Sequence, residues 1–366
     1  MKFLPKLNSK IELGNLSFLP PNATKVERLL PSHMQVHCVE KLREFIYAGS
    51  QYYYLTVLIK QFIINGYSNR NPLAPEYIIK TRNNNLLESK LIANANPLIA
   101  VLIGISGTGK SVAVERILTT YCTQVIEHAK FEKSYLLMDQ LVWLKIDFPC
   151  QPTMRSFCLC ILDKIDQILG TDYFSLFSYQ KQKEEERIEQ VAKILWLHGV
   201  GLFIVDEFQG ITKANGMEKR LILDFLEKIN IVVGIPTLLI GTPSALSVLP
   251  DVFLSTIVRW SKFSFNEEWN SLVHELLKYQ WTLHEVENFS DISRELFEVS
   301  LGITDIAIKL YIAAQQYCIN RDIARVTPEI ITLVNREKYK LVQPMLHVLR
   351  EEDTKNLLQY SAIVSK

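Results

Sequence analysis

Four short apolar runs recur along the chain, at residues 98–105, 141–148, 202–205 and 236–240. Apolar runs of this length between turn signals are typical of strands that are buried on both faces of a parallel sheet. Residues 180–197 carry apolar side chains on one face and charges on the other, which predicts an amphipathic helix between two of the strands. The pattern therefore predicts an α/β fold in which helices sandwich a parallel sheet.

The two ends of the chain follow other patterns. Residues 1–35 are rich in Pro and Asn and predict an extended arm, whereas the apolar spacing over 36–64 predicts one or two helices. After a strand-like segment at 262–265 the strand pattern fades, and four short helices are predicted at 267–284, 290–299, 303–318 and 327–338. We expect an N-terminal arm with helices over 1–93, an α/β core over 94–265, a helical lid over 266–338 and a polar tail over 339–366. The first and the last of these segments are candidates for docking a partner.

Composition narrows the class of protein. Hydrophobic residues make up 48% of the chain and charged residues 22%, which is an ordinary globular balance. Lys and Arg number 40 against 39 Asp and Glu, so any contact with nucleic acid must come from a local cluster. The six cysteines contain no C-x-x-C pair, which argues against a zinc site. The start of the chain does not resemble a signal peptide and no apolar stretch is long enough for a membrane span, so we expect a cytoplasmic protein with no membrane partner.

The sharpest motif is GISGTGKS at residues 104–111, which fits the phosphate-loop pattern G-x-x-x-x-G-K-[ST] and lies between an apolar run and a helical segment. Glycines let backbone N–H groups wrap phosphate oxygens where a Cβ would obstruct them. Lys110 is expected to reach the β- and γ-phosphates, and Ser111 to bind Mg²⁺. The predicted nucleotide-binding residues are Gly104, Ser106, Gly107, Thr108, Gly109, Lys110, Ser111 and Val112.

Polar residues directly follow two of the later apolar runs. Asp206 and Glu207 come after 202–205, at the strand end where open α/β sheets bind their ligands. We expect Asp206 to hold the Mg²⁺ shell and Glu207 to orient and polarise the attacking water. Thr242 follows 236–240 and is a candidate partner of the γ-phosphate or the water, the alternative being a turn residue before a proline.

A phosphate loop, a strand that ends in Asp-Glu, a polar strand exit and a helical lid together resemble the AAA+ ATPases. This resemblance implies ATP and Mg²⁺ as cofactors and a nucleotide between subunits, with Arg259 acting as a finger in the neighbour's site. On spacing alone, Arg259 precedes the strand-like 262–265 and an ordinary surface ion pair is the alternative. The lid departs from the family, because Asp305 stands where a Gly-x-x-Arg pattern has its arginine.

A closer resemblance covers most of the chain. The segments QVIEH (124–128), QLVWLKIDFP (140–149), GTP (241–243) and LGITDIAIKL (301–310) resemble the TnsC/TniB-type AAA+ regulators of transposons that have a heteromeric transposase. The resemblance implies a homo-oligomeric ring or filament on duplex DNA. Such a protein links a target-selection factor of the TniQ/TnsD type to the transposase subunits and licenses DNA transposition.

Candidate DNA contacts lie near an inserted hairpin that we predict at 128–135. Lys130 and Lys133 near its tip, and Arg155 after the following strand, are suited to phosphate contacts that bind duplex without reading sequence. Repetition over many subunits would supply the affinity that one nearly neutral subunit lacks. The alternative for all three side chains is ordinary solvated surface.

Two other functions share the nucleotide motifs. A replication initiator or helicase loader has a similar core and lid but normally adds a winged-helix domain, for which the residues after Glu337 are too few. An interaction module that binds ATP without hydrolysing it is the other, and intact Asp206 and Glu207 argue against it.

Overall fold

The computed structural model describes residues 18–19, 25–68, 70, 82, 86–88, 98–131, 134–178 and 183–338. The chain divides into two compact units, which we call the sheet unit and the lid unit. The described residues of the sheet unit lie within 54–103 and 114–259, and those of the lid unit within 18–53, 104–113 and 260–338. The division of the chain at residues 93, 265 and 338 stays a prediction.

A parallel five-stranded sheet forms the centre of the sheet unit, in the order β6-β7-β8-β3-β9. Its strands are β3 (Ile99–Ile103), β6 (Trp143–Asp147), β7 (Leu202–Asp206), β8 (Thr237–Gly241) and β9 (Ile257–Arg259). Every residue of β3, β7 and β8 is buried, as the continuous apolar runs predict. The predicted α/β fold with a parallel sheet is therefore confirmed.

The position of the last strand corrects one prediction. The strand is β9, which ends at Arg259, whereas the strand-like residues 262–265 do not form a strand. The β-branched Ile257 and Val258 pair with β3, while the backbone N–H of Phe263 donates to the carbonyl of Gly302 at 3.0 Å. Arg259 thus lies on the sheet rather than before it.

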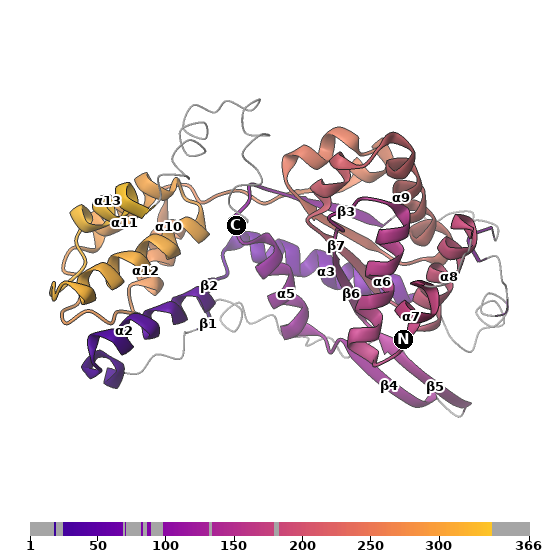
Figure 1. Cartoon of the computed structure of the whole chain (residues 1–366), viewed down its shortest axis with the longest axis horizontal. Helices are drawn as coiled ribbons and strands as arrows, with labels where there is room; N and C mark the ends of the chain where they lie inside the picture. Colours follow the sequence, from indigo (N-terminus) through magenta and orange to yellow (C-terminus); the bar gives the residue numbers. More distant parts are fainter. Residues whose placement is uncertain are drawn as a thin grey trace. The chain divides into compact units, whose positions relative to one another are not determined.

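Helices cover the sheet, and their bounds are α3 (Ser50–Ser68), α5 (Lys110–Tyr121), α6 (Met154–Leu169), α7 (Tyr173–Ser178), α8 (Glu184–Leu197) and α9 (Gly216–Lys228). Along the sheet, the chain passes from β3 to β6 at one edge and then returns through β7 to β8. Because parallel strands are joined by right-handed crossovers, α5 lies on one face of the sheet, and α6 and α9 lie on the other. Figure 1 shows α6, α8 and α9 together beside the sheet. The predicted helix at 180–197 is confirmed as α8.

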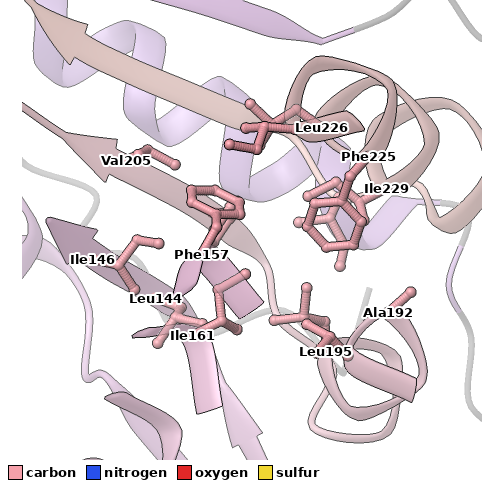
Figure 2. Close-up of a cluster of buried hydrophobic side chains, with 14 of the residues drawn as sticks. Leu144, Ile146, Phe157, Ile161, Ala192, Leu195, Val205, Phe225, Leu226 and Ile229 are labelled. Carbon is pink, nitrogen blue, oxygen red and sulfur yellow. The ribbon is translucent and has the colours of Figure 1, made fainter. Parts of the chain in front are cut away.

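The main core of the sheet unit lies under α6. This helix begins where the Thr153 side chain accepts the backbone N–H of Ser156 at 3.1 Å. Phe157 is fully buried, with the rings of Phe203 and Phe225 at centroid distances of 6.4 Å and 6.2 Å. In Figure 2 the strand residues around Phe157 and those of α8 and α9 converge on this core. Burial of such aromatic side chains stabilises the sheet whose edge carries the candidate site.

The predicted inserted hairpin is confirmed. Strands β4 (Val125–Phe131) and β5 (Ser134–Leu141) pair antiparallel in a two-stranded sheet of their own, outside the five-stranded sheet. Lys130 pairs with Tyr135 near the end of this hairpin. Lys133 lies outside the described residues.

Helices form the lid unit, in which α2 (Ser32–Val39) packs with α10 (Glu267–Leu276), α11 (Phe289–Ser300), α12 (Thr304–Asn320) and α13 (Pro328–Lys338). The four C-terminal helices confirm the predicted helical C-terminal region, except that the first helix ends at Leu276 rather than near residue 284. The shortened helix lets the chain turn so that Trp281 enters the lid core, with its backbone N–H donating to the Gln315 side chain at 2.8 Å.

The predicted extended arm is confirmed only at β1 (Phe18–Leu19), which pairs antiparallel with β2 (Ile46–Tyr47), whereas residues 25–35 are mostly helical. A 3-10 helix spans Lys25–Leu29 and α2 follows it, because the apolar side chains just beyond, Val39, Leu42 and Phe45, are buried in the lid core. The Glu27 carboxylate accepts the indole N–H of Trp281 at 2.8 Å. None of the helices in the described ranges is long and apolar enough to cross a membrane.

Candidate nucleotide site

The phosphate loop begins at Gly104, directly after β3, and runs into α5, which starts at Lys110. Gly107 and Gly109 have φ values of 81° and 88°, in the left-handed region that favours glycine. A Cβ on Gly104 would lie 2.2 Å from the carbonyl oxygen of Trp260. These positions therefore require glycine, and the strand, loop and helix context predicted for the motif is confirmed.

Lys110 lies over the loop instead of extending into solvent. Its ammonium donates to the carbonyl oxygens of Gly104 and Ile105 at 2.8 Å and 2.9 Å, and only 8% of the residue is exposed. The loop therefore holds a fixed positive charge. Ser111 follows on the first turn of α5 and is half-buried, whereas Val112 is exposed.

Two residues further along the lid unit, Trp260 and Asp305, bind the same loop through two other carbonyl groups. The indole N–H of Trp260 donates to Thr108 O at 2.8 Å, and the backbone N–H of Asp305 donates to Gly107 O at 3.1 Å. The side chain of Asp305, which occupies the place of the expected lid arginine, forms an ion pair with Lys309 at 2.7 Å.

Asp206, the last residue of β7, is buried and has both carboxylate oxygens engaged. Its Oδ1 accepts the backbone N–H of Glu207 at 2.9 Å, and its Oδ2 lies 2.9 Å from the ammonium of Lys145 on β6. Burial alone would lower the pKa of Lys145, but the charge and hydrogen bond of Asp206 outweigh burial and raise that pKa. The ammonium of Lys145 is therefore charged at neutral pH.

Glu207 adopts a left-handed backbone conformation, with φ of 53°, that is unusual for a residue with a side chain. Its carboxylate accepts a hydrogen bond from the amide of Gln209. The Gln209 oxygen in turn accepts the backbone N–H of Thr242 at 3.2 Å. Gln209 thus connects the two residues that the sequence predicts near the attacking water.

Strand register places several of these groups at the carboxyl edge of the sheet. Ile103, which precedes the loop, pairs with Gly241 on one side and with Arg259 on the other. Thr242 directly follows Gly241 and is buried, with its hydroxyl 2.8 Å from that of Ser244. Arg259 is exposed, and within the described ranges it makes no ion pair.

The family model that matches is AAA_22, described as an AAA domain, and the match covers residues 94–249. Over residues 94–249 the chain is similar to an AAA domain. The match includes the phosphate loop, Asp206, Glu207 and Thr242, and ends before β9.

Solved structures resemble the chain at low sequence identity. The ORC2 protein of Aeropyrum pernix, solved in ADPNP–ADP complexes, is 14% identical over 72% of this chain and 67% of its own, with a TM-score of 0.44. A Walker-type ATPase of Pyrococcus abyssi is 14% identical over 78% and 77%, with a TM-score of 0.42. The RuvB Holliday junction branch migration motor of Thermotoga maritima is 12% identical over 78% and 79%, with a TM-score of 0.39. No curated protein matches the sequence.

The phosphate loop and Asp206 each have features that suit a magnesium nucleotide. The loop has two glycines in left-handed conformations and a fixed ammonium, which suits phosphate oxygens. Asp206 already accepts one cation, the ammonium of Lys145, at a buried carboxylate oxygen. The roles in Mg²⁺ binding that the sequence predicts for Ser111, in the loop, and for Asp206, at the end of β7, stay predictions.

The candidate DNA contacts occupy two places in the sheet unit. Lys130 lies in β4 of the hairpin. Arg155 is exposed in the first turn of α6, and its guanidinium donates to the carbonyl oxygen of Ser178 at 3.1 Å. This contact with α7 leaves the other N–H donors of the guanidinium available for phosphate oxygens. The role of Arg155 in DNA binding stays a prediction.

The sequence predicted no role for three residues that bind the candidate groups: Lys145 and Gln209 in the sheet unit, and Trp260 in the lid unit. Lys145 has a signal in the sequence, because a lysine within the apolar strand 141–148 requires a partner. Gln209 and Trp260 have none, since their partners Thr242 and Thr108 are distant in the chain.

Replacing Lys145 is expected to destabilise the protein, because the buried carboxylate of Asp206 would lose its counter-charge. We expect Lys145→Met to lower the free energy of unfolding by about 3 kcal/mol, measured by urea unfolding at pH 7. The raised pKa of Lys145 keeps this contribution present at neutral pH, and it is lost only as pH rises past that pKa. Lys164→Met is the matched control, since both lysines line the same cleft of about 1000 Å³. Equal unfolding midpoints for the two variants would contradict this role of the ion pair.

Proposed function

We propose that the protein is an ATP-dependent regulator of DNA transposition of the TnsC/TniB type. It would assemble on duplex DNA as a homo-oligomer and link a target selector of the TniQ/TnsD type to the transposase subunits. Three of the sequence segments that suggest this class carry residues described above: in the sheet unit β6 carries Lys145 and Thr242 follows β8, and in the lid unit α12 begins with Asp305 against the loop. Their placement supports the proposal.

The observation that carries the proposal is the position of Arg259. It ends β9 beside the strand that leads into the phosphate loop, and it is exposed. Within the described residues it has no carboxylate partner. Such an exposed arginine is suited to complete the nucleotide site of a neighbouring subunit. ATP binding would then be coupled to assembly.

The chemistry follows from the predicted roles. The magnesium ion, when bound, neutralises charge on the β- and γ-phosphates. Lys110 and the loop N–H groups bind the phosphates, and Glu207 orients a water molecule and accepts its proton. The water oxygen bonds to the γ-phosphorus as the bond to the bridging oxygen breaks, which yields ADP and phosphate. Loss of the γ-phosphate removes the partner of Arg259 and releases the neighbour.

DNA would be held by many weak contacts. A net charge of +1 gives a single subunit little general attraction for duplex. Lys130 on the hairpin repeats once per subunit in an oligomer, and repetition multiplies weak phosphate contacts into firm binding.

Electron microscopy of the purified protein with random-sequence duplex tests the proposal. We expect rings or filaments on the duplex with a non-hydrolysable ATP analogue, and dispersed protein with ADP. Lys110→Ala is expected to prevent assembly under both conditions, because the loop loses its ammonium. A protein that stays monomeric with the ATP analogue, DNA and the transposase subunits all present would refute the proposal.

A further inference from the structure

Trp260 is the first residue after β9, and its side chain reaches the phosphate loop. The indole N–H donates to Thr108 O at 2.8 Å, across 152 positions of sequence, and only 5% of the residue is exposed. The neighbouring loop carbonyl, Gly107 O, accepts the backbone N–H of Asp305 at 3.1 Å. Two consecutive loop carbonyls thus accept hydrogen bonds from residues far along the chain, Trp260 and Asp305.

Holding a carbonyl fixes the N–H group that follows it. A trans peptide is planar, and its C=O and N–H bonds point in opposite directions. When Gly107 O and Thr108 O are bound by Asp305 and Trp260, the N–H groups of Thr108 and Gly109 must point to the other side of the loop. Backbone N–H groups that face one side form an anion site, and here they are oriented by contacts outside it.

The indole is itself fixed by its surroundings. The ring of Tyr52 packs edge-on against it, with a centroid distance of 5.4 Å. The next residue, Ser261, exchanges hydrogen bonds with the Gln51 side chain at 2.8 Å and 3.1 Å. The backbone oxygen of Trp260 also lies against Gly104, the first residue of the loop. Trp260 therefore has little freedom to leave the loop.

We propose that Trp260 is a positioning residue that presets the phosphate loop for a nucleoside di- or triphosphate. The inference rests on the proposed nucleotide function and adds a residue beyond the phosphate-loop motif. Because the indole orients the loop before nucleotide arrives, part of the ordering cost is removed from binding. The contact involves the loop itself, so ADP and ATP affinity depend on it equally.

The test compares two tryptophans of the lid unit. Trp269 is also buried, and its indole N–H also donates to a backbone carbonyl, that of Ser293 at 3.1 Å, but this acceptor lies away from the loop. We expect Trp260→Phe to weaken the binding of fluorescent ADP and ATP analogues about 10-fold, the value of one lost hydrogen bond. Trp269→Phe is expected to lower thermal stability and leave both affinities unchanged.

Steady-state kinetics supply a readout that a purely structural role would not move. We expect Trp260→Phe to raise KM for ATP and leave kcat near the wild-type value, because binding is lost equally from the ground and transition states. If Trp260→Phe does not fold, incorporation of β-(3-benzothienyl)alanine at position 260 preserves the ring shape and removes only the N–H donor.

Equal affinities for the wild type and the Trp260 variants would overturn the inference while leaving the proposed function intact. A wild-type protein that binds neither ADP nor ATP would instead refute the proposed function. An affinity loss shared by Trp260→Phe and Trp269→Phe would also overturn the inference, because it would indicate general destabilisation of the lid unit.

Discussion

Arg259→Ala is expected to lower DNA-stimulated ATP hydrolysis by about 10³- to 10⁵-fold, the range measured for arginines that stabilise phosphoryl transfer from a neighbouring subunit. The guanidinium is exposed at the end of β9, so its removal breaks no interaction of the described fold. Thermal stability and ATP binding by isolated subunits should therefore stay unchanged. Phosphate release from the assembled protein is the measurement, and Arg220→Ala, which removes an arginine on α9 that is 85% exposed, is the control.

Mixing two inactive variants tests whether Arg259 acts in a neighbour. Arg259→Ala subunits keep Glu207, and Glu207→Gln subunits keep Arg259. In a random mixture about a quarter of the head-to-tail interfaces combine both intact residues, so hydrolysis should return toward that fraction of the wild-type rate. A mixture as inactive as its components would show that Arg259 serves its own subunit.

Glu207→Gln is expected to slow hydrolysis by about 10²- to 10⁴-fold while ATP binding persists. The substitution keeps the oxygen that accepts the Gln209 amide and the same backbone requirements at a φ of 53°, so the local structure is preserved. What is lost is the carboxylate that takes a proton from water. The protein should then remain assembled on DNA, which light scattering after removal of free ATP would follow.

The control for this charge change is Glu186→Gln, on an exposed position of α8. It should disassemble at the wild-type rate. Identical disassembly rates for wild type and Glu207→Gln would contradict a mechanism in which hydrolysis releases the subunits.

The sheet could be predicted because a strand that is buried on both faces appears in the sequence as a continuous run of apolar residues. A strand such as Leu202–Asp206 is apolar at every position until its carboxyl end, so both the strand and the exit of Asp206 are visible in the chain. The phosphate loop is equally visible, since its glycines, lysine and serine are consecutive. Short β9 was misplaced by several residues because only three of its residues pair, too few for a periodic signal.

The contacts that hold the site could not be predicted, because they join distant residues. Nothing near Thr108 in the chain indicates an indole from Trp260, and nothing near Glu207 indicates that Gln209 also binds Thr242. The same reason explains the N-terminal segment. Its prolines favour an extended arm, which the chain keeps at Phe18–Leu19, but over residues 25–35 the burial of Val39 and Leu42 in a core formed mainly by residues beyond 260 overrides that preference.

Loop residues 104–113 belong to the same compact unit as the C-terminal helices. This grouping determines which shortened forms of the protein can bind nucleotide. An expressed fragment limited to the family match at 94–249 would encode the whole nucleotide motif but omit β9, Trp260 and Asp305. Such a fragment would expose the buried edge of β3 to aggregation and leave the loop carbonyls without their donors. A minimal nucleotide-binding protein must therefore extend to the end of α13 at Lys338.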